Sequence, residues 1–434
     1  MKMGNAPLDE RFDVIIVGAG IAGISSALLL AQAGMKVLLL ERSTQAGGKN
    51  ISGGRLYTYS LSSLIPDFTS NAPLERLITQ ERLTFLSDDN AVTLEYRHLP
   101  LAPHTASYSL LRARFDPWLL SQAEAAGAQC LFGVTVDSLI KRNDIVCGVV
   151  ASGEELYAHW VLVAEGANTL LAEKHQLITK PAPHTMAIGI KEVLALPENL
   201  IEERFSLEPQ QGAAWMFAGS CTHGNIGGGF IYTNQNTLSF GVVCNLSVLT
   251  KAHQSVENML EDFRHHSAVS PILKKTERLE YSAHLIPEDV CRSRPPSGAG
   301  YLLVGDAAGF CINTGYTVRG MDLAILSAQA AAQTLIAAWQ KSDFGRSSLA
   351  GYEAALKEKS LRSLLHRYRH IPEMQHKMPR LFDHYPQLAA DFMAEIFAAS
   401  ELPPQPLRNL LWKYAKRSSI FKLLRDALRA GHSL

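Results

Sequence analysis

The pattern of apolar and polar positions is most regular near the N-terminus. Residues 13–17 form a short apolar run rich in β-branched side chains, which predicts a buried parallel strand. Small and aliphatic residues from 24 to 32 follow at helical spacing and stop at Gly34, which predicts a helix with a glycine end. Residues 37–40 predict a second buried strand. These elements indicate a parallel α/β unit.

Three glycines occupy the turn between the first strand and the helix. Gly18, Gly20 and Gly23 have G-x-G-x-x-G spacing, which suits a tight turn, a diphosphate close to the backbone, and close helix–strand packing. The free N–H groups at the helix start favour an anion. Glu41 ends the second strand, where it can accept hydrogen bonds from a ribose. We therefore predict a dinucleotide site. The alternative is an accidental glycine turn in an α/β domain without nucleotide.

Later apolar runs predict two different kinds of sheet. Residues 83–86 and 92–96 predict a hairpin around a turn at 87–90. Further strands are predicted at 129–135, 138–142, 145–151, 160–164 and 301–304. Between 184 and 250 the pattern changes, and a mostly antiparallel sheet is expected from strands at 186–193, 213–220, 228–232 and 238–244. A long helix is predicted from about 322 to 339, and proline-separated helices after 351.

Other candidate ligand contacts follow strands or precede helices. Arg112 stands just before a predicted helix, for which Asp116 is a suitable N-cap. Gly166, after the strand at 160–164, and Gly305-Asp306, after the strand at 301–304, occupy positions where open α/β sheets bind ligands.

A glycine-rich segment, 45–55, follows Glu41 and Arg42. Gly53 and Gly54 allow the backbone to approach a flat ligand, and Lys49 or Arg55 is suited to meet phosphate or a reduced, anionic ring. The alternative is a surface loop with solvated charges.

Composition narrows the classes of function. The chain has 434 residues, 47% hydrophobic and 19% charged, with a net charge of +0, so nucleic acid is not an expected partner. Its six cysteines are scattered without a C-x-x-C pair, which argues against a zinc ribbon, a dithiol centre or an iron–sulfur cluster within this chain. A reduced, cytoplasmic compartment is expected, since no signal peptide is visible. The uncharged residues 323–340 are expected to form a buried helix rather than a membrane span.

The spacing of these motifs resembles the large FAD-binding family built like glutathione reductase and p-hydroxybenzoate hydroxylase. The resemblance implies that Asp306 hydrogen-bonds the ribityl chain and that Arg112 reaches the cofactor. The expected fold class is therefore α/β, a Rossmann-like FAD-binding domain with an inserted, mostly antiparallel sheet and a helical C-terminal region. The expected boundaries are 1–183 and 291–345 for the FAD domain, interrupted by short strands at 56–108, then 184–290 for the substrate or quinone sheet, and 346–434 for the helices.

Four segments resemble the FixC family, the bacterial branch of electron-transfer-flavoprotein:quinone oxidoreductases: KNISGGR at 49–55, WMFAGS at 215–220, GDAAGF at 305–310 and TVRGMDLA at 317–324. This chain has no cysteine after Cys311, so we expect it to lack the cluster-bearing domain of the long oxidoreductases. The resemblance implies FAD as cofactor, an electron-transfer flavoprotein and a small four-iron ferredoxin-like protein as partners, and a quinone as acceptor. Glu165 is a departure, since related sequences usually carry Asp there.

The expected chemistry is that of the flavin. Thr317 and Val318 precede the helix whose N-terminus is expected to stabilise negative charge on the reduced ring, and no residue is predicted to act as a general base. Three alternatives remain: a single-Rossmann NAD(P)H-dependent flavin monooxygenase, an isoprenoid reductase of the geranylgeranyl reductase type, and a flavoprotein that only docks a partner.

The C-terminal stretch from 407 to 430 is basic and amphipathic. Its composition suits contact with an anionic membrane, docking of an acidic protein, or packing on the body with a solvated basic face. A peripheral position at the inner face of the membrane is one expectation that follows.

Overall fold

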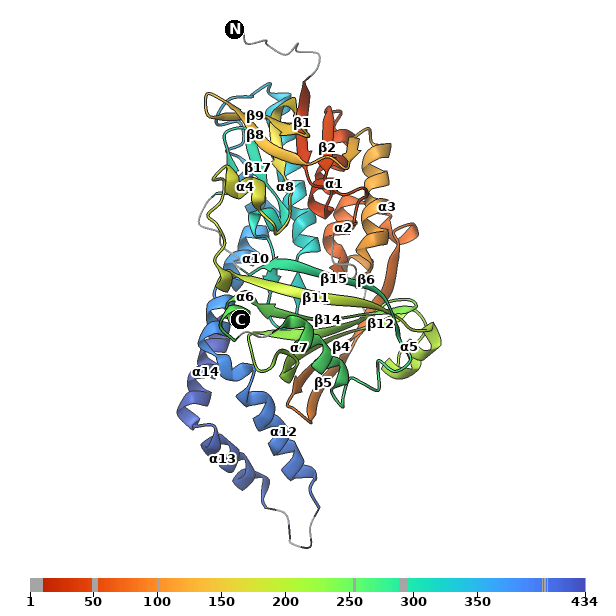
Figure 1. Cartoon of the computed structure of the whole chain (residues 1–434), viewed down its shortest axis with the longest axis vertical. Helices are drawn as coiled ribbons and strands as arrows, with labels where there is room; N and C mark the ends of the chain where they lie inside the picture. The colour runs from red at the N-terminus through yellow and green to blue at the C-terminus, as the bar shows by residue number, and fades with distance from the viewer. Residues whose placement is uncertain are drawn as a thin grey trace.

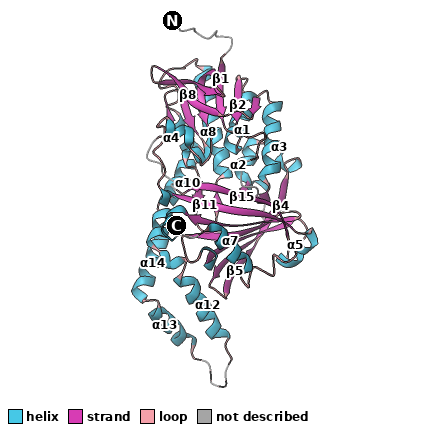
Figure 2. Cartoon of the chain, viewed as in Figure 1, coloured by secondary structure: helices cyan, strands magenta, loops and turns pink. Residues whose placement is uncertain are grey.

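The computed structural model describes residues 11–48, 54–99, 102–252, 255–288, 295–399 and 405–433, together with 401 and 403. Two sheets lie one above the other, and a helical arm continues beyond the second sheet (Figure 1). Figure 2 shows helices between the strands of the two sheets, and further helices beyond the second sheet at the end opposite the first sheet.

The first sheet is built around β1 (Phe12–Val17). Its strand order is β16-β17-β10-β1-β2-β7, and β1 runs parallel to both neighbours, β2 (Val37–Glu41) and β10 (Glu154–Val163). The other strands of this order are β7 (Gln129–Phe132), β16 (Ser297–Gly298) and β17 (Tyr301–Leu303). The hairpin of β8 (Val136–Arg142) and β9 (Ile145–Ala151) pairs with the first half of β10. The predicted parallel unit is therefore confirmed.

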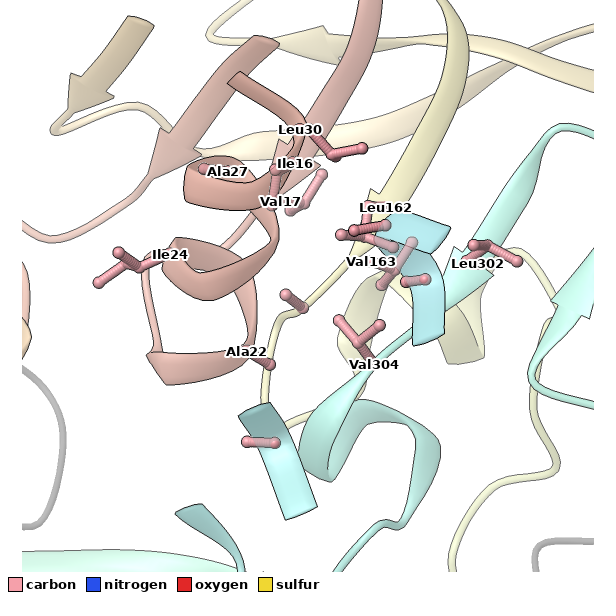
Figure 3. Close-up of a cluster of buried hydrophobic side chains, with 14 of the residues drawn as sticks. Ile16, Val17, Ala22, Ile24, Ala27, Leu30, Leu162, Val163, Leu302 and Val304 are labelled. Carbon is pink, nitrogen blue, oxygen red and sulfur yellow. The ribbon is translucent and has the colours of Figure 1, made fainter. Parts of the chain in front are cut away.

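Helices α1 (Ile21–Gln32), α3 (Arg112–Ala125) and α8 (Met321–Gln340) cover the first sheet. Apolar side chains of α1 meet those of the strands, as Figure 3 shows for Ile16, Val17, Ala22, Ile24, Ala27, Leu30, Leu162, Val163, Leu302 and Val304. These strands, β1, β10 and β17, are far apart in the sequence, so closing this core requires the chain near residues 160 and 300 to fold back on the first strand.

Helix α8 is the one helix in the described parts of the chain that is long and apolar enough to cross a membrane, and 78% of its most apolar window is buried inside the protein. Its polar side chains have partners there. Ser327 Oγ accepts a hydrogen bond from the Gly305 N–H at 3.0 Å and donates to the Ala324 carbonyl at 2.8 Å. The packing therefore identifies α8 as a core helix.

The second sheet has the strand order β15-β11-β14-β13-β12-β4-β6-β3, and β5 (Ala91–Arg97) pairs with β4. Its other strands are β3 (Gly54–Tyr57), β4 (Leu74–Leu86), β6 (Ser107–Leu110), β11 (Met186–Ala195), β12 (Gln211–Gly219), β13 (Gly227–Thr233), β14 (Thr237–Asn245) and β15 (Glu277–Pro287). The β4–β5 hairpin agrees with the sequence prediction. Strands from 54–110 thus share one sheet with strands from 186–287, and β12 joins the two groups by pairing in parallel with β4.

Short helices pack around this sheet, with α5 (Glu198–Phe205) and α7 (Val256–His265) covering its outer apolar face. Helix α2 (Thr58–Leu64) packs on α8, α4 (Leu170–Lys174) on β8, and α6 (Leu246–Ala252) on β11 and β14. The chain then continues through α9 (Tyr352–Glu358), α10 (Leu361–Tyr368), α11 (Ile371–Lys377) and α12 (His384–Phe397).

The basic stretch at the C-terminus folds as two helices, α13 (Leu407–Arg417) and α14 (Ile420–Ser433). Ser419 separates them with a φ of 64°, a left-handed conformation that ends one helix and redirects the chain. Leu410 and Tyr414 are buried against α12, whereas Phe421 and Leu428 are 87% and 75% exposed. Only some of the apolar side chains of α13 and α14 are therefore used for packing.

Asp116 is not an N-cap, so that prediction is wrong. Helix α3 begins at Arg112, and Asp116 lies one turn inside it, where its carboxylate binds the Arg112 guanidinium through contacts of 2.7 and 2.6 Å. The Arg–Asp pair at i, i+4 replaces the expected cap.

We expect Ser327→Ala to lower the free energy of unfolding by about 1–3 kcal/mol, because the buried Gly305 N–H loses its acceptor. Urea denaturation measures the change. Ser121→Ala is the control, since Ser121 lies on an exposed face of α3 and bonds only its own helix. Equal losses in the two variants would contradict this role.

Candidate flavin site

A cavity of about 750 Å³ lies between the carboxyl ends of the first sheet and the inner face of the second sheet. The loops after β1, β2, β10 and β17 line one side. Side chains of β11, β12, β13 and β15 line the other side. Its size and position are typical of a ligand site in an open α/β fold.

The glycine turn forms one end of the cavity. Gly18 has a φ of 109°, and a Cβ atom there would lie 2.4 Å from the Ala164 carbonyl oxygen. A Cβ atom on Gly23 would lie 2.0 Å from the Gly18 carbonyl oxygen. Gly18 therefore lets the turn lie against the chain after β10, and Gly23 lets α1 lie against the turn. The N-terminus of α1 at Gly20, which has no side-chain cap, meets the cavity.

Glu41 stands at the end of β2, on the wall of the cavity. One carboxylate oxygen accepts a hydrogen bond from the Ala19 N–H at 2.9 Å, and the other accepts one from the Ser43 N–H at 2.7 Å. The carboxylate thus holds the glycine turn against the loop that contains Arg42, which also lines the cavity.

Arg112 and Asp306 come from distant parts of the chain and both line the middle of the cavity. Burial alone would lower the pKa of Arg112, but its ion pair with Asp116 and the nearby Asp306 outweigh burial and raise that pKa. The guanidinium is therefore a fixed positive charge beside a carboxylate at the end of the first sheet.

A second helix N-terminus faces the same cavity. Gly320 precedes α8 without a side-chain cap, and Gly320, Met321 and Ala324 line the wall. Helix α8 is held against the Gly305–Ala308 turn by Ser327. Two helix N-termini, those of α1 and α8, thus direct partial positive charge into one space.

Glu165 occupies the position at which related sequences usually carry the shorter Asp. Its two carboxylate oxygens accept hydrogen bonds from the Leu171 and Ala172 N–H groups, each at 2.8 Å, so the side chain caps α4. Gly166 beside it has a φ of 78° and lines the cavity. The extra methylene lets this carboxylate reach the helix.

Most of the residues predicted to bind the cofactor meet at this cavity. Its lining includes Gly18, Gly20, Glu41, Arg42, Gly54, Arg112, Gly166, Gly305, Asp306 and Val318. Gly23 acts one layer back, against Gly18. Thr317 is not part of the lining, because it closes the loop before α8 through hydrogen bonds with Thr314. Lys49 and Gly53 lie outside the described residues. The individual contacts of all these residues with a cofactor remain predictions.

Arg55 also lines the cavity but already has an acidic partner. Its guanidinium donates to Ser107 Oγ at 2.9 Å and forms a bidentate pair with Glu81, with one contact of 2.8 Å. Glu81 therefore neutralises the positive charge of Arg55, which the sequence analysis had offered as a partner for an anionic ring.

Sequence reasoning missed three ionisable residues on the second-sheet side, namely Lys191, His284 and Glu288. Lys191 is buried, and burial lowers its pKa well below the ordinary value, while Glu280 opposes this shift. Burial also lowers the pKa of His284, against the influence of Asp306. A lysine within an apolar strand was a signal in the sequence, but only the pairing of β11 with β15 brings it near His284.

The chain is similar over its whole length to proteins of one family. It is 45% identical to the probable electron transfer flavoprotein-quinone oxidoreductase YdiS of Escherichia coli (strain K12), over 98% of this chain and 100% of that protein. It is 44% identical to Protein FixC of the same strain, over 97% of this chain and 98% of that protein. Residues 371–434 match the ETF-QO/FixC family C-terminal domain, and residues 13–112 match the FAD dependent oxidoreductase family.

The chain belongs to the ETF-QO/FixC family. It is an FAD-dependent oxidoreductase that works in electron transfer. The fold is also shared with a geranylgeranyl bacteriochlorophyll reductase-like protein from Thermoplasma acidophilum, with a TM-score of 0.71 over 96% of this chain and 99% of that chain. At 22% identity, this likeness concerns the fold alone.

The cavity fits the FAD of this family. The uncapped N-terminus of α1 suits the diphosphate, because its free N–H groups have no protein acceptor side chain at Gly20. The glycine contacts at Gly18 and Gly23 leave no room for a side chain where the helix approaches the strand. The second uncapped N-terminus, at α8, suits the electron-rich end of a reduced flavin.

We expect Gly23→Ala to purify with little or no bound FAD, because the added methyl group collides with the Gly18 carbonyl and displaces α1. The ratio of flavin to protein absorbance measures the loss. Gly351→Ala serves as the control, since no atom lies within 4 Å of a Cβ there. Full flavin content in Gly23→Ala would show that the close contact is not required.

Proposed function

We propose that this protein passes electrons from an electron-transfer flavoprotein, with the help of a separate small four-iron ferredoxin-like protein, to a quinone. The names of its relatives support the donor and the acceptor. The observation that carries the quinone assignment is the change of character along the cavity. Charged residues surround the cofactor end, whereas Met374, Met378 and Phe382 are among the apolar residues at the opposite end, next to α11.

The cofactor supplies two-electron redox chemistry when bound. The chain's own contribution is placement: α1 and Glu41 hold the adenosine and diphosphate end, and Arg112 with Asp306 holds the middle. The N-terminus of α8 stabilises negative charge at the far end. An apolar acceptor enters from the side of α11, so that water and charge stay at the opposite end of the cavity.

A separate ferredoxin-like partner is proposed because the chain has no set of cysteines for a cluster. In the described part of the chain, no three His, Cys, Asp or Glu side chains are grouped so that they could hold a metal ion. No cysteine follows Cys311 anywhere in the sequence. A four-iron cluster needs four ligands, usually cysteine thiolates, and these would come from the partner.

The helical arm supports a peripheral contact with a membrane. Six of its apolar side chains are exposed to solvent, namely Leu407, Leu411, Trp412, Phe421, Leu424 and Leu428. Phe421, Leu424 and Leu428 of α14 line an open groove beside α11. Basic residues accompany them, among them Arg408, Lys416, Lys422 and Arg425. Helix α14 packs on α11, and Met374 of α11 and Ala430 of α14 both line the cavity, so the arm lies next to its apolar end. We propose that this arm rests on an anionic membrane and admits the quinone from it.

Anaerobic reduction tests the electron path. The holoprotein is mixed with reduced electron-transfer flavoprotein, with and without the ferredoxin-like protein, and a short-chain quinone is then added. We expect the flavin absorbance to fall rapidly only when both partners are present, and to return when quinone is added.

Different results would favour the other candidates. Rapid bleaching by NADPH alone would identify a monooxygenase or reductase of the hydroxylase type. Consumption of an isoprenoid double bond by the reduced protein would favour an isoprenoid reductase. If no quinone reoxidises the reduced flavin, the result would favour a flavoprotein that only docks a partner.

Vesicle binding tests the membrane contact. We expect the double variant Phe421→Ser/Leu428→Ser to lose at least tenfold in partitioning to vesicles that contain anionic lipid, because each side chain contributes about 1.5–3 kcal/mol when buried. Co-sedimentation measures this. Leu94→Ser, at a position on β5 that is 64% exposed, is the control and is expected to bind normally. Wild-type protein that stays in solution would contradict the contact.

A further inference from the structure

A carboxylic acid, Glu288, lies toward the apolar end of the cavity. Glu288 follows the last residue of β15 and lines the cavity together with Ile226, Val243 and Ile286. Its backbone N–H donates to the Thr185 carbonyl at 2.9 Å, which fixes the end of the strand. A carboxyl group among apolar residues, at the side from which an acceptor enters, is costly unless it has a task.

A single side-chain hydrogen bond orients this carboxyl group. Asn245 Nδ2 donates to Glu288 Oε2 at 2.6 Å and to the His184 carbonyl at 3.0 Å. Burial raises the pKa of Glu288 to about 6, and the Asn245 hydrogen bond opposes that shift. The group therefore exchanges a proton near physiological pH, as an acid that must give and regain protons should.

Lys191 and His284, the two other ionisable residues that sequence reasoning missed, are coupled to the cofactor end. The pKa values of Lys191 and His284 both respond to Arg112, and that of His284 also responds to Asp306 and Arg42. Glu288 is near Cys311, because burial first, then Asp306 and then Glu288 raise the pKa of that thiol, and Cys311 Sγ lies 3.8 Å from where a Cβ of Gly320 would be, at the start of α8. Its place is therefore between the end of α8 that faces the flavin and the apolar entrance.

Conversion of a quinone to a hydroquinone requires two electrons and two protons. Oxidation of the reduced, anionic cofactor releases two electrons and one proton, so one more proton must come from elsewhere. Water is a poor donor within an apolar pocket. A carboxylic acid beside the acceptor can break its own O–H bond, form the O–H bond on the quinone oxygen, and later regain a proton from solvent.

We propose that Glu288 delivers the second proton to the quinone that is reduced in this cavity. The proposal rests on the proposed function, and it assigns to Glu288 a direct contact with the reacting oxygen. Asn245 is then a positioning residue, because it holds the carboxyl group through its amide and is itself held by the His184 carbonyl.

Other titratable groups lie near Glu288, and an experiment must distinguish their titration from that of Glu288. Burial raises the pKa of Cys244 on β14 to about 12 and that of Cys311 well above its ordinary value, so both thiols stay protonated near neutrality. His184 lies beyond Asn245, and His376 of α11 contacts the His184 carbonyl at 3.1 Å. A titration near pH 6 belongs to Glu288 only if it disappears when Glu288 is replaced.

The test uses Glu288→Gln, which keeps the shape and the acceptor for Asn245 but has no acidic proton. Holoprotein is reduced anaerobically with dithionite and mixed with a short-chain quinone in a stopped-flow instrument. We expect reoxidation of the flavin to slow by about a hundredfold, since general acid catalysis contributes about 10²–10⁴-fold. Reoxidation by ferricenium, which takes an electron without a proton, is expected to be unchanged.

Two further measurements identify the carboxyl group itself. Below pH 6 the infrared spectrum of wild-type protein is expected to contain a protonated-carboxyl C=O band that Glu288→Gln lacks. The wild-type rate with quinone is expected to fall as the pH rises through about 6, because the acid form disappears, and Glu288→Gln should show no such step. Glu288→Asp, which retains an acidic proton, is expected to restore part of the rate.

The outcomes separate the two proposals. If quinone does not reoxidise wild-type protein, the proposed function fails and this role fails with it. If wild type and Glu288→Gln react with quinone at the same rate, or if the pH step persists in the variant, only the role of Glu288 is overturned. Equal slowing with quinone and ferricenium would show a general defect rather than a lost proton donor, and would also overturn it.

Discussion

The contact between the backbone of Gly18 and that of Gly23 is the constraint on which the flavin site depends. With no side chain between them, α1 lies directly on the turn after β1, and its first N–H groups open into the cavity. Glu41 then holds the same turn from β2 through the Ala19 N–H. A phosphate-binding end built in this way needs no cation, because the helix terminus and its fixed dipoles supply the positive potential.

The cavity has two chemically different ends because two sheets face each other across it. The first sheet contributes strand ends, helix N-termini and the Arg112–Asp116 pair, all of which suit a charged, extended cofactor. The second sheet and α11 contribute mainly apolar side chains, with Glu288 among them. An electron carrier of this kind must keep its cofactor solvated by protein dipoles while it offers an apolar route to a second molecule, and the opposed sheets meet both needs.

The C-terminal arm extends this division beyond the core. Leu410 and Tyr414 pack inward, whereas α14 turns away at Ser419 and leaves Phe421 and Leu428 exposed. Met374 of α11 lines both the cavity and the open groove that Phe421, Leu424 and Leu428 of α14 line, so the exposed apolar side chains of α14 and the apolar end of the cavity are neighbours. The membrane contact that we propose for this arm would therefore leave a short route from the cavity to lipid.

The sequence by itself determined the parts that depend on local pattern. Buried strands, the glycine turn, Glu41, the Gly305-Asp306 turn and the long helix follow from residues near one another in the chain, where periodicity and backbone freedom act directly. Tertiary structure decided the rest, because it depends on contacts between distant segments. Only folding paired β4 with β12, drew Asp116 to Arg112 instead of the helix cap, and engaged Arg55 with Glu81. Only folding brought Glu288 to the apolar end of the cavity, since nothing in its local sequence says which strand end will face the cofactor.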